Sequence, residues 1–270
     1  ATYVAVDVSM PAPWHVVVCL AAGLAGGALA GAIPGVLKAF TGAHEVIVTI
    51  MLNYAVGALL IWDLSTPSMG LQAPNQVNDV SKSIPGSATL PHLFGPTLRV
   101  NVGLIIALLA AVIAWWLLDR STLGFRFRMT GASPHAARTA GVDAKRTLIL
   151  VFLVSGAFVG LAGMVQVTSV DLFLSSAGPQ GYAVTIGLSA ITVALLGRNR
   201  PLGIVLGAIL IGALSNGAFN VEAVTGISTD LTTIIQAVMV LCVAAPAMVA
   251  RIFRLRPGNA ATVEFGGWGE

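Results

Sequence analysis

The polar side chains inside the apolar stretches of this sequence are the residues that could do chemistry. Glu45, Thr49 and Asn53 recur every four residues, so a helix places them on one face. Asn53 falls near the middle of its stretch, where an unpaired amide is costly. Two interpretations stay open: the face lines a path for a polar solute, or Asn53 hydrogen-bonds a neighbouring helix and stabilises packing.

Further polar positions lie in the second half of the chain. Thr185 and Ser189 share a lesser polar face, and Asn216 and Gln236 fall in the last two apolar stretches. Amide and hydroxyl groups with few full charges suit a hydroxyl-rich solute, although each residue alone also fits helix packing. The predicted translocation pathway consists of Glu45, Thr49, Asn53, Thr185, Ser189, Asn216 and Gln236.

Motifs for catalysis, nucleotide binding and metal binding are missing from the sequence. It contains no GxxxxGK[ST], HExxH or GxSxG, and its His and Cys residues are scattered. We therefore predict no catalytic residue, no cofactor and no metal site, and a protein that is not an enzyme. The energy for transport against a concentration gradient would then come from another subunit or from an ion gradient. Ion-driven carriers usually keep carboxylates within their spans, whereas here the acids lie at span ends or in loops.

The apolar stretches themselves indicate a membrane protein. Mean hydropathy is +0.89 and only 9% of residues are charged, against about 25% in soluble domains. A helix needs about 20 apolar residues to cross the hydrocarbon core. We predict an all-α, multi-pass bundle in the cell membrane with about seven segments, the fifth short or re-entrant. The segments are Trp14–Ile33, Glu45–Trp62, Val100–Leu118, Leu148–Val170, Ala183–Gly197, Leu202–Phe219 and Leu231–Ala250.

The placement of basic residues predicts the orientation. In an alternating topology 12 of the 14 Lys and Arg residues fall on one side, and only Lys82 and Arg99 on the other. The positive-inside rule makes the first side cytoplasmic. Residue 1 would then be extracytoplasmic, so we expect further spans upstream. The predicted organisation is a membrane domain at 1–256, with an external loop at 63–99 and a cytoplasmic loop at 119–147, followed by a cytoplasmic tail at 257–270.

Glycines recur at helical spacing in three places. Small residues at intervals of four let helix backbones approach closely in lipid; the alternative is that glycine is simply common in membrane helices. We predict packing ridges without a chemical role. The ridges are Gly23, Gly27, Gly31 and Gly35, then Gly156 and Gly160, and finally Gly203 and Gly207.

The basic loop contains a short segment, SPHAARTA, with the features of a helix. Ser133 can cap it and Pro134 stands just inside, where a missing N–H costs nothing. A short polar helix that projects from a membrane bundle suits docking to a soluble partner. The alternative is a solvated basic loop held near anionic lipid.

Three motifs resemble permease subunits in the simple-sugar and nucleoside branch of bacterial ABC importers. They are GAHEVIVTIMLNY (Gly42–Tyr54), GASPHAARTAGV (Gly131–Val142) and ITVALLGRNRPLGIVLGAILIGAL (Ile191–Leu214). The first is similar to the sugar and nucleoside branch rather than to the branched-chain amino acid relatives. Two departures are His44, where relatives often have Asn, and the missing initial spans.

The resemblance implies a subunit of an ATP-driven importer that works by alternating access, for a nucleoside or a simple sugar. It implies as partners cytoplasmic ABC ATPase subunits, a second permease (the same or homologous), an extracytoplasmic solute-binding protein and membrane lipid, but no nucleic acid. An ion-coupled carrier or channel and a purely structural membrane subunit remain alternatives. The implied ATPase-coupling residues are Gly131, Ser133, Pro134, Ala136, Ala137, Arg138 and Gly141.

Overall fold

The computed structural model describes residues 2–7, 11–66, 72, 80–91, 101–174, 178–226, 228 and 230–244. The chain divides into two compact units, Ala1–Gly187 and Leu188–Glu270. Among the described residues the regular structure is helical, apart from an isolated bridge between Gln72 and Ser81. This confirms the predicted all-α class. The predicted tail at 257–270 and most of the predicted loop at 63–99 lie outside the described residues.

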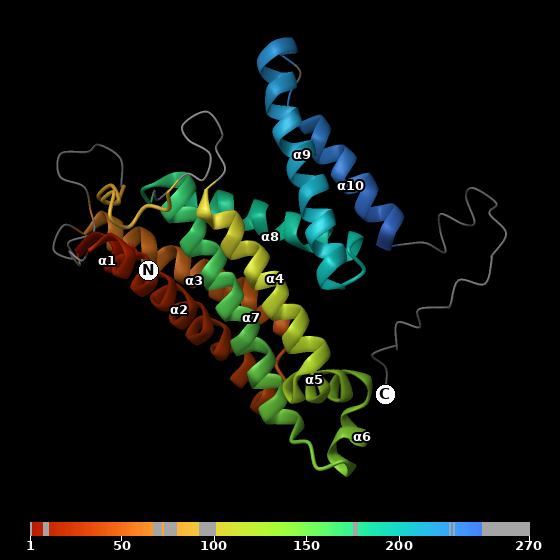
Figure 1. Ribbon diagram of the computed structural model, residues 1–270. Coiled ribbons are helices and arrows are strands. Elements are labelled where there is room, and N and C mark those ends of the chain that lie inside the picture. Colours follow the sequence, from red (N-terminus) through yellow and green to blue (C-terminus); the bar gives the residue numbers. More distant parts are fainter. Residues whose placement is uncertain are drawn as a thin grey trace, which may run out of the picture. The chain divides into compact units, whose positions relative to one another are not determined.

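Within the described part of the chain, five helices are long and apolar enough to cross a membrane. Each of the seven predicted segments falls on a helix (Figure 1). The fifth and seventh correspond to α8 (Gly178–Leu196) and α10 (Asp230–Ala244), which do not meet that criterion over their described residues. The five long helices are α2 (Ala12–Thr41), α3 (Glu45–Ser65), α4 (Val102–Arg120), α7 (Ala144–Gln166) with its π-helical continuation η2 (Val167–Asp171), and α9 (Pro201–Thr225).

Helix α2 is longer than predicted, because it continues past Ile33 to Thr41 with Pro34 inside it. Proline removes one backbone hydrogen bond from a helix, but helices in membranes tolerate it since their neighbours compensate. The helix ends instead at Gly42, whose left-handed φ of 70° lets its N–H bond the Lys38 carbonyl.

The packing of α2 against α7 forms the centre of the first unit. Gly27 and Gly31 lie against the backbone of Gly156 and Gly160, and a methyl group added at Gly31 would lie 2.5 Å from the Phe152 carbonyl oxygen. Such contacts exist only because neither helix has side chains there. They confirm the predicted ridges on α2 and α7 and show that the two helices run antiparallel.

Helices α2, α3, α4 and α7 alternate in direction within this unit. A turn at residues 42–44 reverses the chain between α2 and α3, and Gly103 at the start of α4 contacts Val165 near the end of α7. The unit therefore has a basic end, with Lys38, Arg120 and Lys145, and a distal end, with α1 (Thr2–Asp7) and residues 80–91.

Exposed tryptophans lie toward both ends of these helices, Trp14 and Trp62 at the distal end and Trp115 and Trp116 toward the basic end. Two such belts are typical of the two membrane–water interfaces. Most other large apolar side chains of the long helices are also exposed, which suits contact with lipid or with further helices.

The second unit contains the end of α8, α9 and α10. Gly203 in the first turn of α9 lies against the Gly197 backbone, and Gly207 approaches Val193. Between α9 and α10, the Gln236 amide donates a hydrogen bond to the Ser215 hydroxyl at 3.1 Å. The third predicted glycine ridge thus also packs helices closely.

Candidate functional site

The polar face of α3 begins at the basic end. The Glu45 carboxylate lies 2.6 Å from the Lys38 ammonium across the turn between α2 and α3. The Thr49 hydroxyl donates to the Glu45 carbonyl at 2.9 Å, inside its own helix. The polar groups of these two side chains therefore already have partners within the chain. The ion pair also connects the end of α2 to the start of α3.

Asn53 differs from these two residues. It lies near the middle of α3, is exposed, and its amide makes no hydrogen bond with any residue that the structure describes. An unpaired amide in hydrocarbon costs several kcal/mol. Its partner must come from beyond the described part of this chain: a helix of another subunit, a passing solute or water.

The other predicted pathway residues are not brought to this face by any described contact. Gln236 is engaged with Ser215, and Ser189 is half-buried on α8. Asn216 is exposed on α9, where its carbonyl accepts the Asn220 amide at 3.0 Å. Thr185 lies in the part of α8 whose side chains are outside the described ones. The role of these residues stays a prediction.

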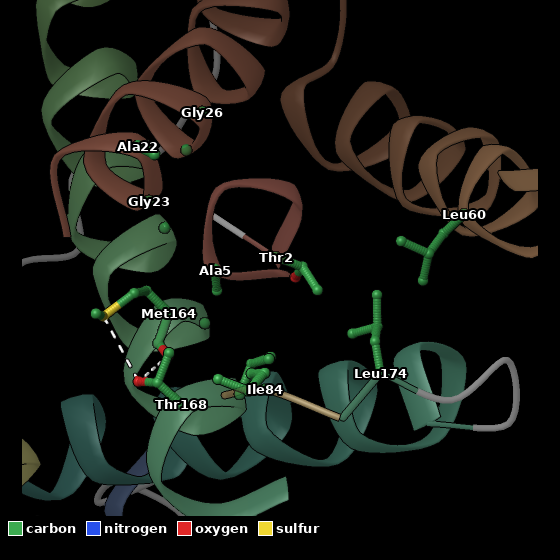
Figure 2. Close-up of a pocket in the computed structure, with 14 residues that line it drawn as sticks. Thr2, Ala5, Ala22, Gly23, Gly26, Leu60, Ile84, Met164, Thr168 and Leu174 are labelled. Carbon is green, nitrogen blue, oxygen red and sulfur yellow. Dashed lines mark hydrogen bonds between the residues drawn. The ribbon is translucent and has the colours of Figure 1, made fainter. Parts of the chain in front are cut away.

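A cavity of about 310 Å³ lies at the distal end of the first unit (Figure 2). Its wall is made of glycine backbone from α2 and α7 and of aliphatic side chains such as Leu60, Ile84 and Leu174. The Thr168 hydroxyl at its edge already donates to the Met164 carbonyl at 2.8 Å. The cavity offers a hydroxyl-rich solute few partners, and none of the predicted pathway residues lines it.

Hydrogen bonds from His15 hold the distal end together, a role that the sequence did not indicate. The imidazole is fully buried, with Nδ1 3.0 Å from the Ser87 hydroxyl and Nε2 3.1 Å from the Val4 carbonyl oxygen. Residues 80–91 are also joined to the end of η2, because the Ile84 N–H donates to the Leu172 carbonyl at 2.9 Å. The contacts link α1, α2 and the segment after α3.

At the basic end the chain turns sharply from α4 into α5 (Thr122–Ala132). Ser121 breaks the helix with an extended ψ of 156°, and its hydroxyl accepts the Gly124 N–H at 3.0 Å. Gly124 packs on the Leu117 and Leu118 carbonyls, which leaves no room for a side chain. Helix α5 therefore runs across the end of α4 instead of continuing it (Figure 1).

The predicted short helix follows as α6 (Pro134–Thr139), which confirms the expected cap. The Ser133 hydroxyl accepts the Ala136 N–H at 3.2 Å, and Pro134 occupies the first turn. Ala137 is buried, whereas Arg138 is exposed.

The turn after α6 returns the chain to the long helices. Gly141 takes a left-handed φ of 77°, and the Val142 N–H bonds the Ala137 carbonyl at 2.9 Å. The Asp143 carboxylate then caps α7 by accepting the Lys145 N–H at 3.0 Å. The result is a small helix anchored at both ends, with a polar surface directed away from the spans.

The sequence of the chain matches one family of membrane transport proteins. The family described as "Branched-chain amino acid transport system / permease component" matches residues 1–244. The chain belongs to this permease family. With its membrane-length helices, it is a multi-pass protein of the cell membrane. No solved structure matches the chain.

Relatives of this permease carry names from nucleoside and sugar transport. The guanosine ABC transporter permease protein NupP of Bacillus subtilis is 37% identical over 238 residues, which are 87% of this chain and 66% of the relative. The nucleoside ABC transporter permease protein NupB of Lactococcus lactis is 34% identical, over 82% of this chain and 61% of the relative. The glucose ABC transporter permease protein TsgB13 of Haloferax volcanii is 30% identical, over 89% of this chain and 64% of the relative. The chain thus spans less than two thirds of the length of each.

Proposed function

We propose that this chain is the membrane-spanning subunit of an ATP-driven importer that moves a nucleoside or a simple sugar into the cytoplasm. The match to the permease family over residues 1–244 carries the proposal. Two relatives whose names refer to guanosine or nucleoside transport are 37% and 34% identical to the chain. A nucleoside is therefore the first substrate to test, and glucose the second.

In this proposal, other subunits supply the energy for transport. The chain has no P-loop, so separate cytoplasmic ATPase subunits would bind and hydrolyse ATP. Helix α6, capped by Ser133 and closed by Gly141, would enter a cleft of the ATPase with Arg138 and Ala136 exposed. Its anchoring to α7 through Asp143 would pass a displacement of α6 into the helix bundle.

Transport itself would follow alternating access. The exposed, unpaired Asn53 supports a polar path beside α3, completed by a second permease of the same or a homologous kind. An extracytoplasmic binding protein would deliver the solute at the distal end. This chain would supply no covalent chemistry, because its part is to change which side of the membrane the path faces.

The test is uptake of labelled guanosine and glucose in cells that express the complete transporter, with native permease or with Arg138→Glu. Glutamate reverses the charge that the exposed Arg138 presents to the proposed ATPase. A lost charged hydrogen bond costs about 1.5–3 kcal/mol, so uptake and co-purification of the ATPase should both fall by about tenfold or more. Arg138→Lys, which keeps the charge and the helix, should retain most of the uptake. Uptake that persists without any ATPase subunit would refute the importer and favour an ion-driven carrier.

A further inference from the structure

Helix α5 is the element of the basic end that the transport proposal leaves without a role. It has 11 residues, which makes it about 16 Å long and far too short to span the bilayer. It packs across the end of α4 through Gly124. Helix α6, in contrast, lies farther from the spans (Figure 1).

The depth of the turn between α4 and α5 follows from the length of α4. A helix of 19 residues rises about 28 Å, close to the thickness of the hydrocarbon core. Arg120 at its end therefore lies at the level of the lipid headgroups. Trp116, one turn earlier, is 57% exposed, as expected for an interfacial aromatic side chain.

The cations at this turn exceed the acids available to pair with them. Arg128 and Asp119 form an ion pair at 3.2 Å. Arg120 and Arg126 are both exposed and have no acidic partner among the described residues. Phe125, next to Arg126, is 52% exposed. The turn thus combines two guanidinium groups that have no acidic partner among the described residues with aromatic side chains that are exposed and lie within one helical turn of them in the sequence.

We propose that this turn, the α4–α5 surface formed by Trp116, Arg120, Phe125 and Arg126, binds the headgroups of anionic phospholipid. Guanidinium groups recognise phosphate by paired hydrogen bonds, and basic residues beside a span attract anionic lipid. The aromatic side chains enter the acyl boundary beside the bound headgroup. Helix α5 then holds the end of α4 against the membrane while α6 stays free for a soluble partner.

A protein partner is the competing occupant of this surface. Headgroup depth favours lipid, because a soluble subunit would reach α6 before it reached the end of α4 (Figure 1). The exposed Phe125 and Trp116 also suit an acyl boundary better than water. The proposal does not depend on the transported solute, so it can be tested without transport.

The experiment measures lipid preference at the turn itself. The full chain, with Trp14→Phe, Trp62→Phe and Trp268→Phe, keeps its fluorescence at Trp115 and Trp116. It is titrated in detergent with brominated phosphatidylglycerol or brominated phosphatidylcholine, and quenching reports binding. We expect phosphatidylglycerol to bind more tightly than phosphatidylcholine. The ratio of the two affinities should fall about fivefold for each arginine removed, in Arg120→Gln and in Arg126→Gln.

Two control variants separate the outcomes. The pair Arg120→Lys and Arg126→Lys keeps the charge but not the paired hydrogen bonds, so it should keep most of the lipid preference that the glutamine pair loses. Arg138→Gln removes the same charge from α6 and should change nothing at the turn. Equal quenching by both lipids, or an equal loss in Arg138→Gln, would overturn the proposal. So would a glutamine pair that keeps its lipid preference but no longer co-purifies with the ATPase, since α5 would then be a protein contact.

Discussion

The Asn53 amide, near the middle of α3, has no hydrogen-bond partner among the described residues. If it touches the solute, Asn53→Leu removes one or two hydrogen bonds worth about 0.5–1.5 kcal/mol each. We predict that the KM for uptake rises about tenfold, while the amount of permease in the membrane stays unchanged. Labelled-solute uptake over a concentration series, together with immunoblots of membranes, measures both quantities.

Met51→Leu is the matched control for this prediction, because Met51 is an exposed neighbour on α3 that carries no amide. Its uptake should equal that of the native permease. The opposite pattern for Asn53→Leu, a normal KM with much less protein in the membrane, would assign Asn53 to packing against another subunit. That result would leave the family assignment intact and remove Asn53 from the pathway.

Local signals in the sequence predicted some residue roles correctly, and distant contacts account for the ones it missed. Ser133 and Pro134 act within one turn, so their cap is visible in the sequence and is confirmed. One of the two partners of His15 is Ser87, 72 residues away in a segment without periodicity. No pattern around His15 indicates that its ring would be buried and bonded on both nitrogens.

At the scale of elements, apolar length predicted the spans well and their ends poorly. The predicted first segment ended at Ile33, but α2 continues through Pro34 to Thr41 and still packs on α7 at Gly35. Helix α5 was missed because Gly124 and Gly131 resemble loop residues. Gly124 is instead required by the close approach to α4. A glycine that permits packing and a glycine that permits a turn cannot be told apart without the partner helix.

The α2–α7 contact gives a matched pair of substitutions. A Cβ at Gly27 would lie 2.6 Å from Cα of Gly160, whereas one at the adjacent Gly26 meets nothing within 4 Å. We predict that Gly27→Ala destabilises the permease by about 1–3 kcal/mol, as overpacking does. Gly26→Ala should be neutral or slightly stabilising, because alanine favours helix more than glycine does.

Thermal unfolding of both purified variants in the same detergent tests this pair. A clear fall in melting temperature for Gly27→Ala alone would agree with the backbone contact. Equal temperatures for Gly26→Ala and Gly27→Ala would mean that α2 and α7 are farther apart than described. The measurement needs no substrate, so it tests the element without assuming its function.

For the whole molecule, the charge distribution and the helix directions both bear on which end of the helices faces the cytoplasm. The four long helices of the first unit alternate, so that residues 80–91 and helix α6 lie at opposite ends. The charge distribution predicts that the end with α6 is cytoplasmic, because the topology expected from the sequence puts 12 of the 14 basic residues on that side. Labelling of single cysteines at the two ends tests this orientation.

We predict that Ser83→Cys reacts with an impermeant maleimide in intact cells, whereas Ala136→Cys reacts only after permeabilisation. Both parent residues are exposed, and a background with Cys19→Ala and Cys242→Ala removes the native thiols. The two positions control for each other, because in intact cells only Ser83→Cys should be labelled. Reversed labelling would place α6 outside the cytoplasm, beyond reach of any ATPase. The importer proposal would then fail even though the chain is still a member of the permease family, because the coupling helix could not meet its energy source.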